Sequence, residues 1–274
     1  MASTEHCGLW IADCGSAVRR ALDGILSVVL APSCAACDRP LDRPTAGPVC
    51  DGCWRSILPL TPPLCDRCGD PLPSWRAISL PLARCPRCRR APRLIDRARA
   101  IGAYDGALRA IVHALKYEGR RSLAAPLAAL MRERGADMLD GACCAIPVPL
   151  HPARRRARGF NQALDLCRHL RVPVVAALRR VRATAMQTGL PAAQRHRNVR
   201  NAFDTTSAGR SLGPAVVVLV DDVSTTGATL EACARVLKAN GIAEVRALTA
   251  ARVVGSSSKS AKTLASTPVK QHIL

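Results

Sequence analysis

Apolar residues change their spacing along the chain, and the spacing predicts where helices and strands lie. Residues 15–31 carry apolar side chains at helical intervals, which predicts an amphipathic helix ended by Pro32. Beyond residue 97, short apolar runs alternate with longer amphipathic stretches. Strands are therefore expected at 97–104, 143–150, 216–220 and 244–253.

The stretches between these strands carry helix start and stop signals. Asp105 is expected to cap a helix that ends near Gly119, and Ser122 a second helix that ends at Gly135. Further helices are expected at 160–170 and 229–240, and a short element at 174–181. This alternation predicts an α/β fold with a mostly parallel sheet flanked by helices on both faces.

The same pattern suggests four parts: an N-terminal helical region (1–31), a cysteine-rich module (32–92), the α/β domain (93–254) and a low-complexity tail (255–274) that is expected to be disordered. No apolar run approaches the roughly 18 residues of a membrane span. Asp23 interrupts the run that could otherwise pass for a secretion signal, so a cytoplasmic protein is expected.

Eight of the 14 cysteines fall into four CxxC pairs. The pairs are Cys34/Cys37, Cys50/Cys53, Cys65/Cys68 and Cys85/Cys88. Two thiolates on a tight turn bind one side of a tetrahedral zinc ion, and a second such turn completes the site. Disulfides or a redox pair are the alternatives, but a cytosolic chain disfavours the first and four pairs exceed the needs of the second. Two structural zinc ions are therefore expected, with sequential and cross-brace pairing both open.

The charge narrows the class of partner. The chain has 40 basic and 20 acidic residues, which favours polyanions or phosphates as ligands, although a solvated arginine surface is the plain alternative. Aromatic residues make up only 3% of the chain. Any binding to single-stranded DNA is therefore expected to depend on phosphate contacts rather than on base stacking.

The stretch "VVVLVDDVSTTGATL", residues 216–230, is the strongest candidate for a binding site. In an open parallel sheet, ligands bind beyond the carboxyl ends of the strands, where Asp221 and Asp222 are expected. Carboxylates there suit a ribose diol, directly or through magnesium. The following small-residue loop at a helix N-terminus suits a phosphate. No GxxxxGK[ST] motif is present, and no GxGxxG follows a strand, so neither a Walker loop nor a dinucleotide fold is supported.

Several motifs together resemble one family. The stretch 216–230 is similar to the phosphoribosyl pyrophosphate (PRPP) signature of type I phosphoribosyltransferases. With the four CxxC pairs, "YDGALRAIVHALKYEGRRSLAAPLA", "IPVPLHPARRRARGFNQA" and "RATAMQTGLPAAQRHRNVRNAF", the chain resembles the ComF family over about residues 25–253. The resemblance implies a type I phosphoribosyltransferase-like domain behind a small double zinc ribbon, with partners in competence and DNA uptake.

The resemblance also implies roles for individual residues. Asp221 and Asp222 would hold the ribose at the catalytic centre. The arginine-rich loop after the strand at 143–150 would face the pyrophosphate, through Arg154 and Arg158 and with Arg155 and Arg156 as further candidates. Lys116 would approach the same pocket. The PRPP-binding stretch would comprise Asp221, Asp222, Val223, Ser224, Thr225, Thr226, Gly227, Ala228 and Thr229. A hood loop over the site would contribute Gln187, Arg195, Arg197 and Asn198.

Three functions remain open at this point. The first is a transferase that moves a phosphoribosyl group from PRPP, with magnesium, to an unknown acceptor and releases pyrophosphate. The second is a non-catalytic adaptor that binds single-stranded DNA and uses the pocket for a regulatory nucleotide or phosphate. The third is a zinc-stabilised scaffold with a vestigial pocket, which the intact acid pair and loop argue against.

Overall fold

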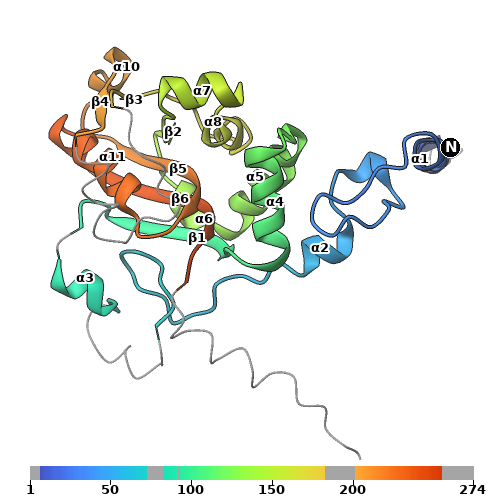
Figure 1. The fold of residues 1–274 in the computed structure, drawn as a ribbon, viewed down its shortest axis with the longest axis horizontal. Coiled ribbons are helices and arrows are strands. Elements are labelled where there is room, and N and C mark those ends of the chain that lie inside the picture. The colour runs from blue at the N-terminus through green and yellow to red at the C-terminus, as the bar shows by residue number, and fades with distance from the viewer. Residues whose placement is uncertain (1–6, 73–82, 92, 183–200, 255–274) are drawn as a thin grey trace, which may run out of the picture.

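One parallel sheet forms the centre of the α/β domain (Figure 1). The computed structural model describes residues 7–72, 83–91, 93–182 and 201–254. The strands run in the order β1-β6-β5-β2, and every neighbouring pair is parallel. Their bounds are β1 (Arg97–Ala103), β6 (Glu244–Arg252), β5 (Val216–Ser224) and β2 (Cys144–Pro147). The parallel sheet expected from the alternating pattern is thus confirmed.

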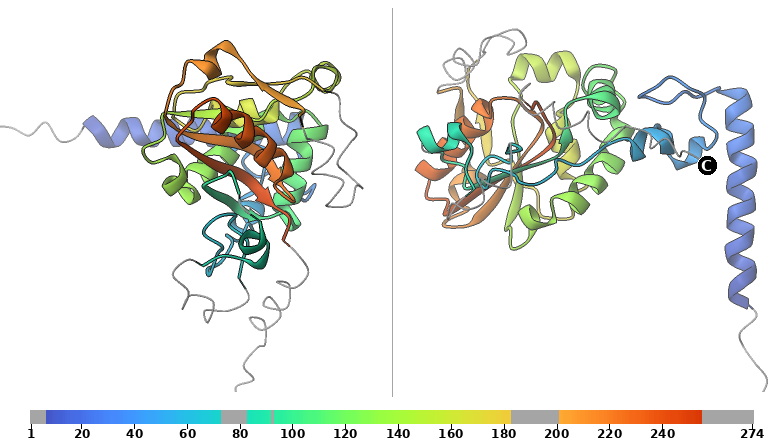
Figure 2. Two further views of the ribbon diagram at one scale, coloured as in Figure 1. Left: turned by 90° about the vertical axis from the view of Figure 1, so that its left-hand side faces the viewer. Right: turned by 90° about the horizontal axis from the view of Figure 1, so that it is seen from below.

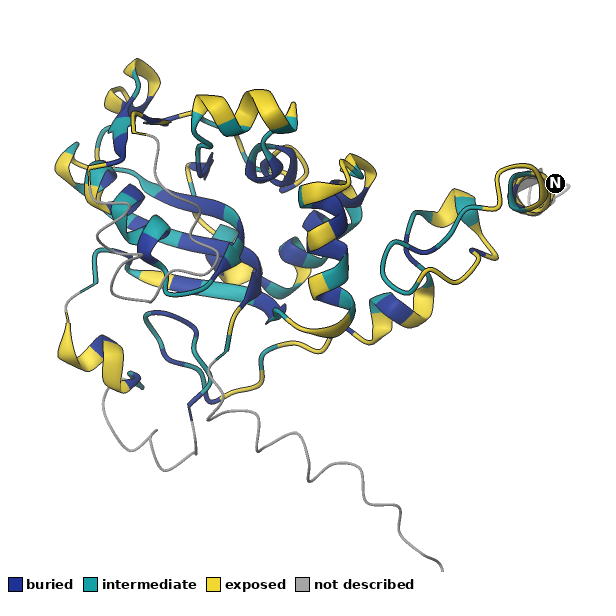
Figure 3. Cartoon of the chain, in the orientation of Figure 1, coloured by how far each residue is buried: buried dark blue, intermediate teal, exposed yellow. Residues whose placement is uncertain are grey.

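Helices cover both faces of this sheet, because its strands are apolar on both sides. One face packs against α4 (Gly106–Tyr117), α5 (Ala124–Arg134) and α8 (Gln162–Cys167). The other face packs against α11 (Ala228–Ala239). Figure 3 shows that the buried residues concentrate in the sheet and on the helix faces that meet it. The two hydrophobic cores fix the carboxyl ends of the strands in place.

Smaller elements surround this centre. An antiparallel pair lies beside α11, formed by β3 (Leu178–Arg180) and β4 (Phe203–Thr205). Short helices complete the domain, and they are η3 (Arg121–Leu123), α6 (Ala136–Leu139), α7 (Pro152–Arg158) and α10 (Ser207–Arg210).

The N-terminal region contains two cysteine-rich ribbons and one long helix. The first ribbon includes η1 (Pro44–Ala46) and α2 (Asp51–Arg55), and the second includes α3 (Pro86–Arg90). The helix α1 (Cys7–Val29) extends from the first ribbon, away from the sheet (Figure 2). The expected boundary between module and domain at residue 92 stays a prediction, and the expected tail at 255–274 lies outside the described residues.

The structure orients α1 in a way that its apolar pattern did not predict. Asp23 is buried and accepts a hydrogen bond from the Thr45 backbone N–H, and Ser27 donates one to the Leu41 carbonyl. The polar side of this part of the helix therefore faces the first ribbon. The apolar side chains behind the amphipathic prediction, such as Val18 and Ile25, are exposed.

Two other expectations need correction. Ser122 does not cap a helix, because it lies inside the 3₁₀ turn η3, and α5 begins only at Ala124. The arginine-rich segment after β2 is the helix α7 rather than a loop. Pro152 at its first turn and a hydrogen bond from the Ala153 N–H to the His151 ring stabilise its start.

Candidate functional site

The acid pair lies at the carboxyl end of β5, beyond the core of the sheet. Asp222 is buried on the side of α4, with 4% of its side chain exposed. Asp221 is half-buried, and its Oδ1 accepts a hydrogen bond from the Asp222 backbone N–H at 2.9 Å. Successive side chains of a strand point to opposite faces, so the two carboxylates leave β5 on different sides, but at the strand end they remain close enough to interact with each other.

Lys116 at the end of α4 is the counter-charge of this pair. Its Nζ lies 2.8 Å from Asp222 Oδ2, and 19% of the lysine side chain is exposed. Burial opposes the charge of Lys116, but the Asp222 and Asp221 carboxylates outweigh it, and its pKa is raised. Asp222 Oδ2 is buried, and the Lys116 ammonium is its partner among the described residues. The structure therefore places Lys116 beside the acid pair, where it binds Asp222, and its contact with PRPP stays a prediction.

Asp221 titrates in an unusual range. Burial, followed by repulsion from the Asp222 carboxylate, raises the pKa of Asp221 to about 7, while Lys116 acts in the opposite direction. Shifts of this kind are common where a carboxylate is placed to meet a ligand.

The loop from Ser224 to Thr229 leads from β5 into α11. Gly227 adopts a left-handed φ of 77°, which a side chain would disfavour, and it starts the helix. Thr226 Oγ1 accepts a hydrogen bond from the Ala228 N–H at 3.3 Å. The Ser224 side chain is buried, and its Oγ accepts a hydrogen bond from Arg252 Nη1 at 3.4 Å. Ser224 thus faces the protein interior, whereas Thr225 and Thr226 are half-exposed.

The arginines of α7 divide into two groups. Arg154 and Arg158, four residues apart, are half-buried, and Arg155 and Arg156 are exposed. Arg158 donates to Gln162 Oε1 at 2.8 Å and lies over the Tyr117 ring, 5.3 Å from its centroid. The two arginines expected at the site therefore share the inner side of the helix.

Arg180 of β3 is a candidate site residue that the sequence did not suggest. Its side chain is buried and lies over the Phe203 ring. Burial and then repulsion from Arg154 lower the pKa of Arg180, and Asp221 partly offsets this effect. The guanidinium is thus close enough to Arg154 and Asp221 to sense both charges. The pairing of β3 with β4 places Arg180 at this position, so no local sequence motif could predict it. The expected hood residues Gln187, Arg195, Arg197 and Asn198 lie outside the described residues.

The eight CxxC cysteines form two groups of four. One is Cys34, Cys37, Cys50 and Cys53, and the other is Cys65, Cys68, Cys85 and Cys88. Within each group the sulfur atoms lie within 4.8 Å of one another. Zinc–sulfur bonds of about 2.3 Å in a tetrahedron separate sulfurs by about 3.8 Å. The Cys37–Cys50 and Cys68–Cys85 distances of 3.9 and 3.6 Å fit that geometry. The pairing is sequential, and the donors fit two structural zinc ions.

Two family models match the chain. A double zinc ribbon domain matches residues 25–89, and a phosphoribosyl transferase domain matches residues 157–268. Among solved structures, an allosteric regulatory enzyme of purine biosynthesis aligns with 50% of this chain and 30% of its own, with a TM-score of 0.33 and 16% identity. That likeness is too weak to carry an argument.

Curated relatives align over most of their length. The DNA utilization protein YhgH of Salmonella typhimurium is 34% identical over 226 residues, which cover 78% of this chain and 93% of the relative. The YhgH protein of Escherichia coli K12 is 34% identical over 228 residues, with the same coverage. Competence protein F of Haemophilus influenzae is 31% identical over 208 residues, which cover 72% and 87%. With its double zinc ribbon and its phosphoribosyltransferase domain, this chain belongs to the ComF family of competence protein F and YhgH.

Proposed function

We propose that the chain binds PRPP with magnesium at the carboxyl end of β5. One observation carries the proposal: an acid pair at the end of a central parallel strand runs directly into a glycine-containing loop and a helix N-terminus. The carboxylates match the two ribose hydroxyls, and the loop N–H groups and the helix dipole match the 5′-phosphate.

The environment of the acid pair supports this ligand. Asp222 Oδ2 is a buried acceptor whose partner is the Lys116 ammonium, and a carboxylate oxygen can accept a second hydrogen bond, which a ribose hydroxyl would supply. Asp221, with a pKa near 7, accepts a hydroxyl or a cation more readily as the pH rises. When bound, magnesium would neutralise the pyrophosphate group of PRPP. Arg180 would contribute charge on the same side, because it senses the Asp221 carboxylate, and Arg154 would add to it, because it lies close enough to Arg180 to lower the pKa of Arg180.

A group transfer from PRPP would break the bond between ribose C1 and the pyrophosphate oxygen and form a bond from C1 to an acceptor nucleophile. Pyrophosphate would leave with the bonding electron pair. Positive charge develops on the ribose in such a transition state, and Asp221 and Asp222 would stabilise it from the hydroxyl side. We identify no acceptor-recognition element among the described residues, so the acceptor is not specified.

The relatives suggest the setting of this activity. They are named for competence and for DNA utilization, and we propose that this chain also acts in DNA uptake. No helix among the described residues is long and apolar enough to cross a membrane.

A second candidate function is an adaptor for single-stranded DNA. Arg155 and Arg156 are exposed on α7 beside the pocket, and the whole chain carries a net charge of +20. Exposed arginines of this kind fit a phosphate backbone. In this case the pocket would hold a regulatory nucleotide or phosphate, and no transfer would follow.

Titration calorimetry of PRPP and magnesium into the zinc-loaded protein tests the first proposal. The wild type is expected to bind saturably, and the Asp221→Asn/Asp222→Asn variant to lose that binding while keeping its affinity for single-stranded DNA. Equal PRPP binding by both proteins would overturn the proposed ribose site. A parallel loss of DNA affinity in a folded variant would show that the two ligands share one site.

A further inference from the structure

The two zinc ribbons are structural repeats. The similarity includes the turns around the CxxC pairs and not only the cysteines themselves. "SCAACDRPL", residues 33–41, and "LCDRCGDPL", residues 64–72, fold in the same way. In each turn the first cysteine N–H bonds to the residue five positions later, Arg39 or Asp70, at 2.8 and 2.7 Å. In each ribbon, the second cysteine pair is part of a short helix, α2 or α3. The first cysteine of that pair is the N-cap, and the second lies within the helix. A position-by-position comparison therefore shows what is special to each ribbon.

The first difference is at the left-handed residue of the turn. The first ribbon has Asp38 there, with φ of 57°, and the second has Gly69, with φ of 69°. A Cβ atom on Gly69 would lie 2.6 Å from the Ala98 carbonyl oxygen of β1. The Ala98 N–H also donates to the Arg67 carbonyl at 2.8 Å. Glycine at this position thus lets the second ribbon join the outer edge of the sheet.

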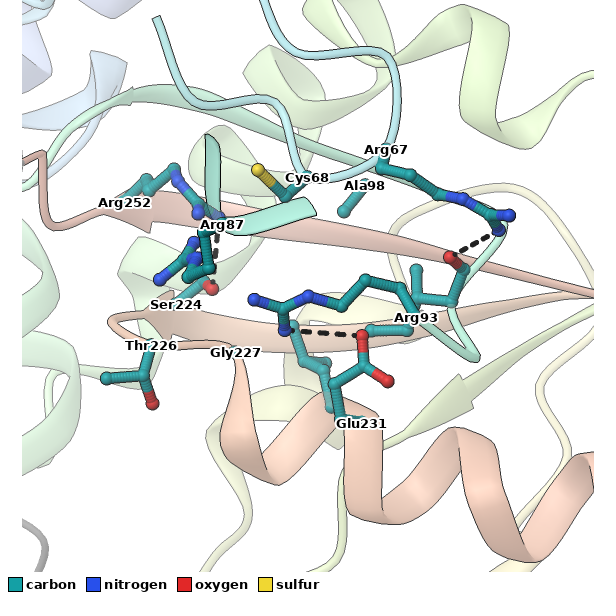
Figure 4. A pocket seen from close by; sticks show the side chains of 12 residues that line it. Arg67, Cys68, Arg87, Arg93, Ala98, Ser224, Thr226, Gly227, Glu231 and Arg252 are labelled. Carbon is teal, nitrogen blue, oxygen red and sulfur yellow. Dashed lines mark hydrogen bonds and ion pairs between the residues drawn. The ribbon is translucent and has the colours of Figure 1, made fainter. Parts of the chain in front are cut away.

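The second difference is at the next residue. Arg39 in the first ribbon donates to its own Cys37 sulfur at 3.5 Å. Asp70 in the second ribbon reaches out of the ribbon and accepts a hydrogen bond from Arg252 Nε, at the end of β6. Its other oxygen stays within the ribbon, 2.9 Å from Arg87 Nη2 and 3.4 Å from the Cys68 sulfur. One carboxylate therefore joins the second zinc site to Arg252 at the carboxyl edge of the sheet, and Figure 4 shows Arg252 beside Ser224 at that edge.

Arg252 continues this connection to the phosphate loop. Only 5% of its side chain is exposed, and its Nη1 donates to Ser224 Oγ at 3.4 Å. Ser224 is the last residue of β5 and the first of the loop. A buried guanidinium held between a carboxylate and a hydroxyl has little freedom, because removing either partner leaves a buried donor unsatisfied.

A second connection reaches the helix that follows the loop. Arg93 and Leu94, in the segment that leaves the second ribbon, both contact Glu231 in the first turn of α11. The Leu94 N–H donates to Glu231 Oε2 at 3.0 Å, and Arg93 Nη1 lies 3.4 Å from Oε1. Arg93 also lies close to the loop itself. Its Nη1 is 3.8 Å from the position that a Cβ atom on Gly227 would occupy. Both ends of the loop are thus held from the ribbon side.

These residues enclose a small cavity beneath the loop, lined by Arg67, Arg87, Arg93, Arg252, Ser224 and Gly227. The cavity does not include Asp221 or Asp222, and its arginines pair with Asp96, Asp70 and Glu231. It is a joint between two parts of the protein rather than a second ligand site.

From this arrangement we infer that the second zinc ribbon positions the phosphate-binding loop, and that Asp70 and Arg252 are the positioning residues. An effect on PRPP binding rests on the proposed function. The connection from the second ribbon to the loop through Asp70, Arg252 and Ser224 does not depend on any ligand. The first ribbon lacks both features and has no such role.

Hydrogen exchange of the zinc-loaded, ligand-free full chain tests the link directly. Asp70→Ala is the test variant, and Arg39→Ala, at the equivalent position of the first ribbon, is the matched control. We expect amides of residues 224–231 to exchange about tenfold faster in Asp70→Ala and at the wild-type rate in Arg39→Ala, with two zinc ions bound in both. Arg252→Lys keeps the positive charge on a single nitrogen that cannot bridge Asp70 and Ser224, so it is expected to act like Asp70→Ala without changing the sequence of the second ribbon.

Unchanged loop exchange in both Asp70→Ala and Arg252→Lys would overturn the inference. Calorimetry of PRPP with the same proteins separates it from the proposed function. Faster exchange together with weaker PRPP binding supports both. Faster exchange with no PRPP binding by the wild type supports the link and overturns the PRPP proposal.

Discussion

At the scale of single residues, the contact between Lys116 and Asp222 defines the ligand-free site. Two adjacent carboxylates at a buried strand end repel each other, and the lysine from α4 offsets that repulsion. A ligand or a magnesium ion that approaches Asp222 must therefore either displace the Lys116 ammonium or bind the carboxylate beside it. The pair explains how the protein keeps an acid pair at this position before any ligand arrives.

Replacing Lys116 by methionine removes this counter-charge while it keeps most of the apolar side chain. We expect the free energy of unfolding at pH 7.5 to fall by about 2 kcal/mol, since a buried carboxylate then lacks its partner. The loss should shrink in the Lys116→Met/Asp222→Asn double variant, measured by urea denaturation. Additive losses in the double variant would mean that the two side chains do not stabilise each other.

Asp221 should make stability depend on pH. Its pKa is about 7 in the folded protein, against about 4 in an unfolded chain, so the folded state binds more protons between these values. The contribution of this carboxyl to stability is therefore full below pH 4 and declines as the pH rises through 7. Asp221→Asn removes the decline, so the Tm of the variant minus that of the wild type should be more positive at pH 8 than at pH 5. An equal difference at both pH values would contradict the raised pKa.

Residue-scale chemistry was predictable where it was encoded in a continuous stretch. The acid pair, the loop and the CxxC pairs are local motifs, and the structure places them at a strand end and in two four-sulfur groups. Arg180, Arg252 and Asp70 could not be found in this way. Their partners are distant in sequence, and nothing local distinguishes them from other charged surface residues.

At the scale of elements, the close contact between the second ribbon and β1 depends on glycine. Gly69→Ala should destabilise the protein by about 2–4 kcal/mol, because the Ala98 carbonyl must move in addition to the cost of a left-handed alanine. Gly119→Ala is the matched control. Its φ is 67°, but no atom lies within 4 Å of the added Cβ, so about 1 kcal/mol is expected. Equal losses in thermal or urea unfolding would show that the ribbon does not pack tightly on β1.

Elements were predicted well where apolar periodicity matched the final burial. The strands of the sheet and helices α4 and α11 appear where they were expected, to within a few residues. The predictions that depended on polar residues were less successful. Ser122 resembles a cap but lies in a 3₁₀ turn, and the arginine-rich segment folds as α7 because a proline and a histidine start it. The apolar side of α1 is exposed. Apolar periodicity therefore predicts which side of a helix is apolar, but not whether another part of the protein covers that side.

At the scale of the whole molecule, the net charge of +20 affects every binding experiment. A protein this basic attracts any phosphate compound at low salt, so binding of PRPP by itself does not establish a specific pocket. The acid pair distinguishes non-specific attraction of phosphates from binding in a specific pocket. The acid pair would repel a bare anion and is useful only when a ribose presents its hydroxyls between two phosphate-binding regions.

The most direct test of this account compares PRPP, ribose 5-phosphate and inorganic pyrophosphate by calorimetry at 0.15 M salt with magnesium. The account predicts that PRPP binds at least about tenfold more tightly than either fragment, since it alone contacts the loop, the acid pair and the arginines together. It also predicts that Asp221→Asn/Asp222→Asn removes this advantage. Pyrophosphate binding as tight as that of PRPP, and equally tight in the double variant, would contradict the account and indicate an arginine surface that binds any polyanion.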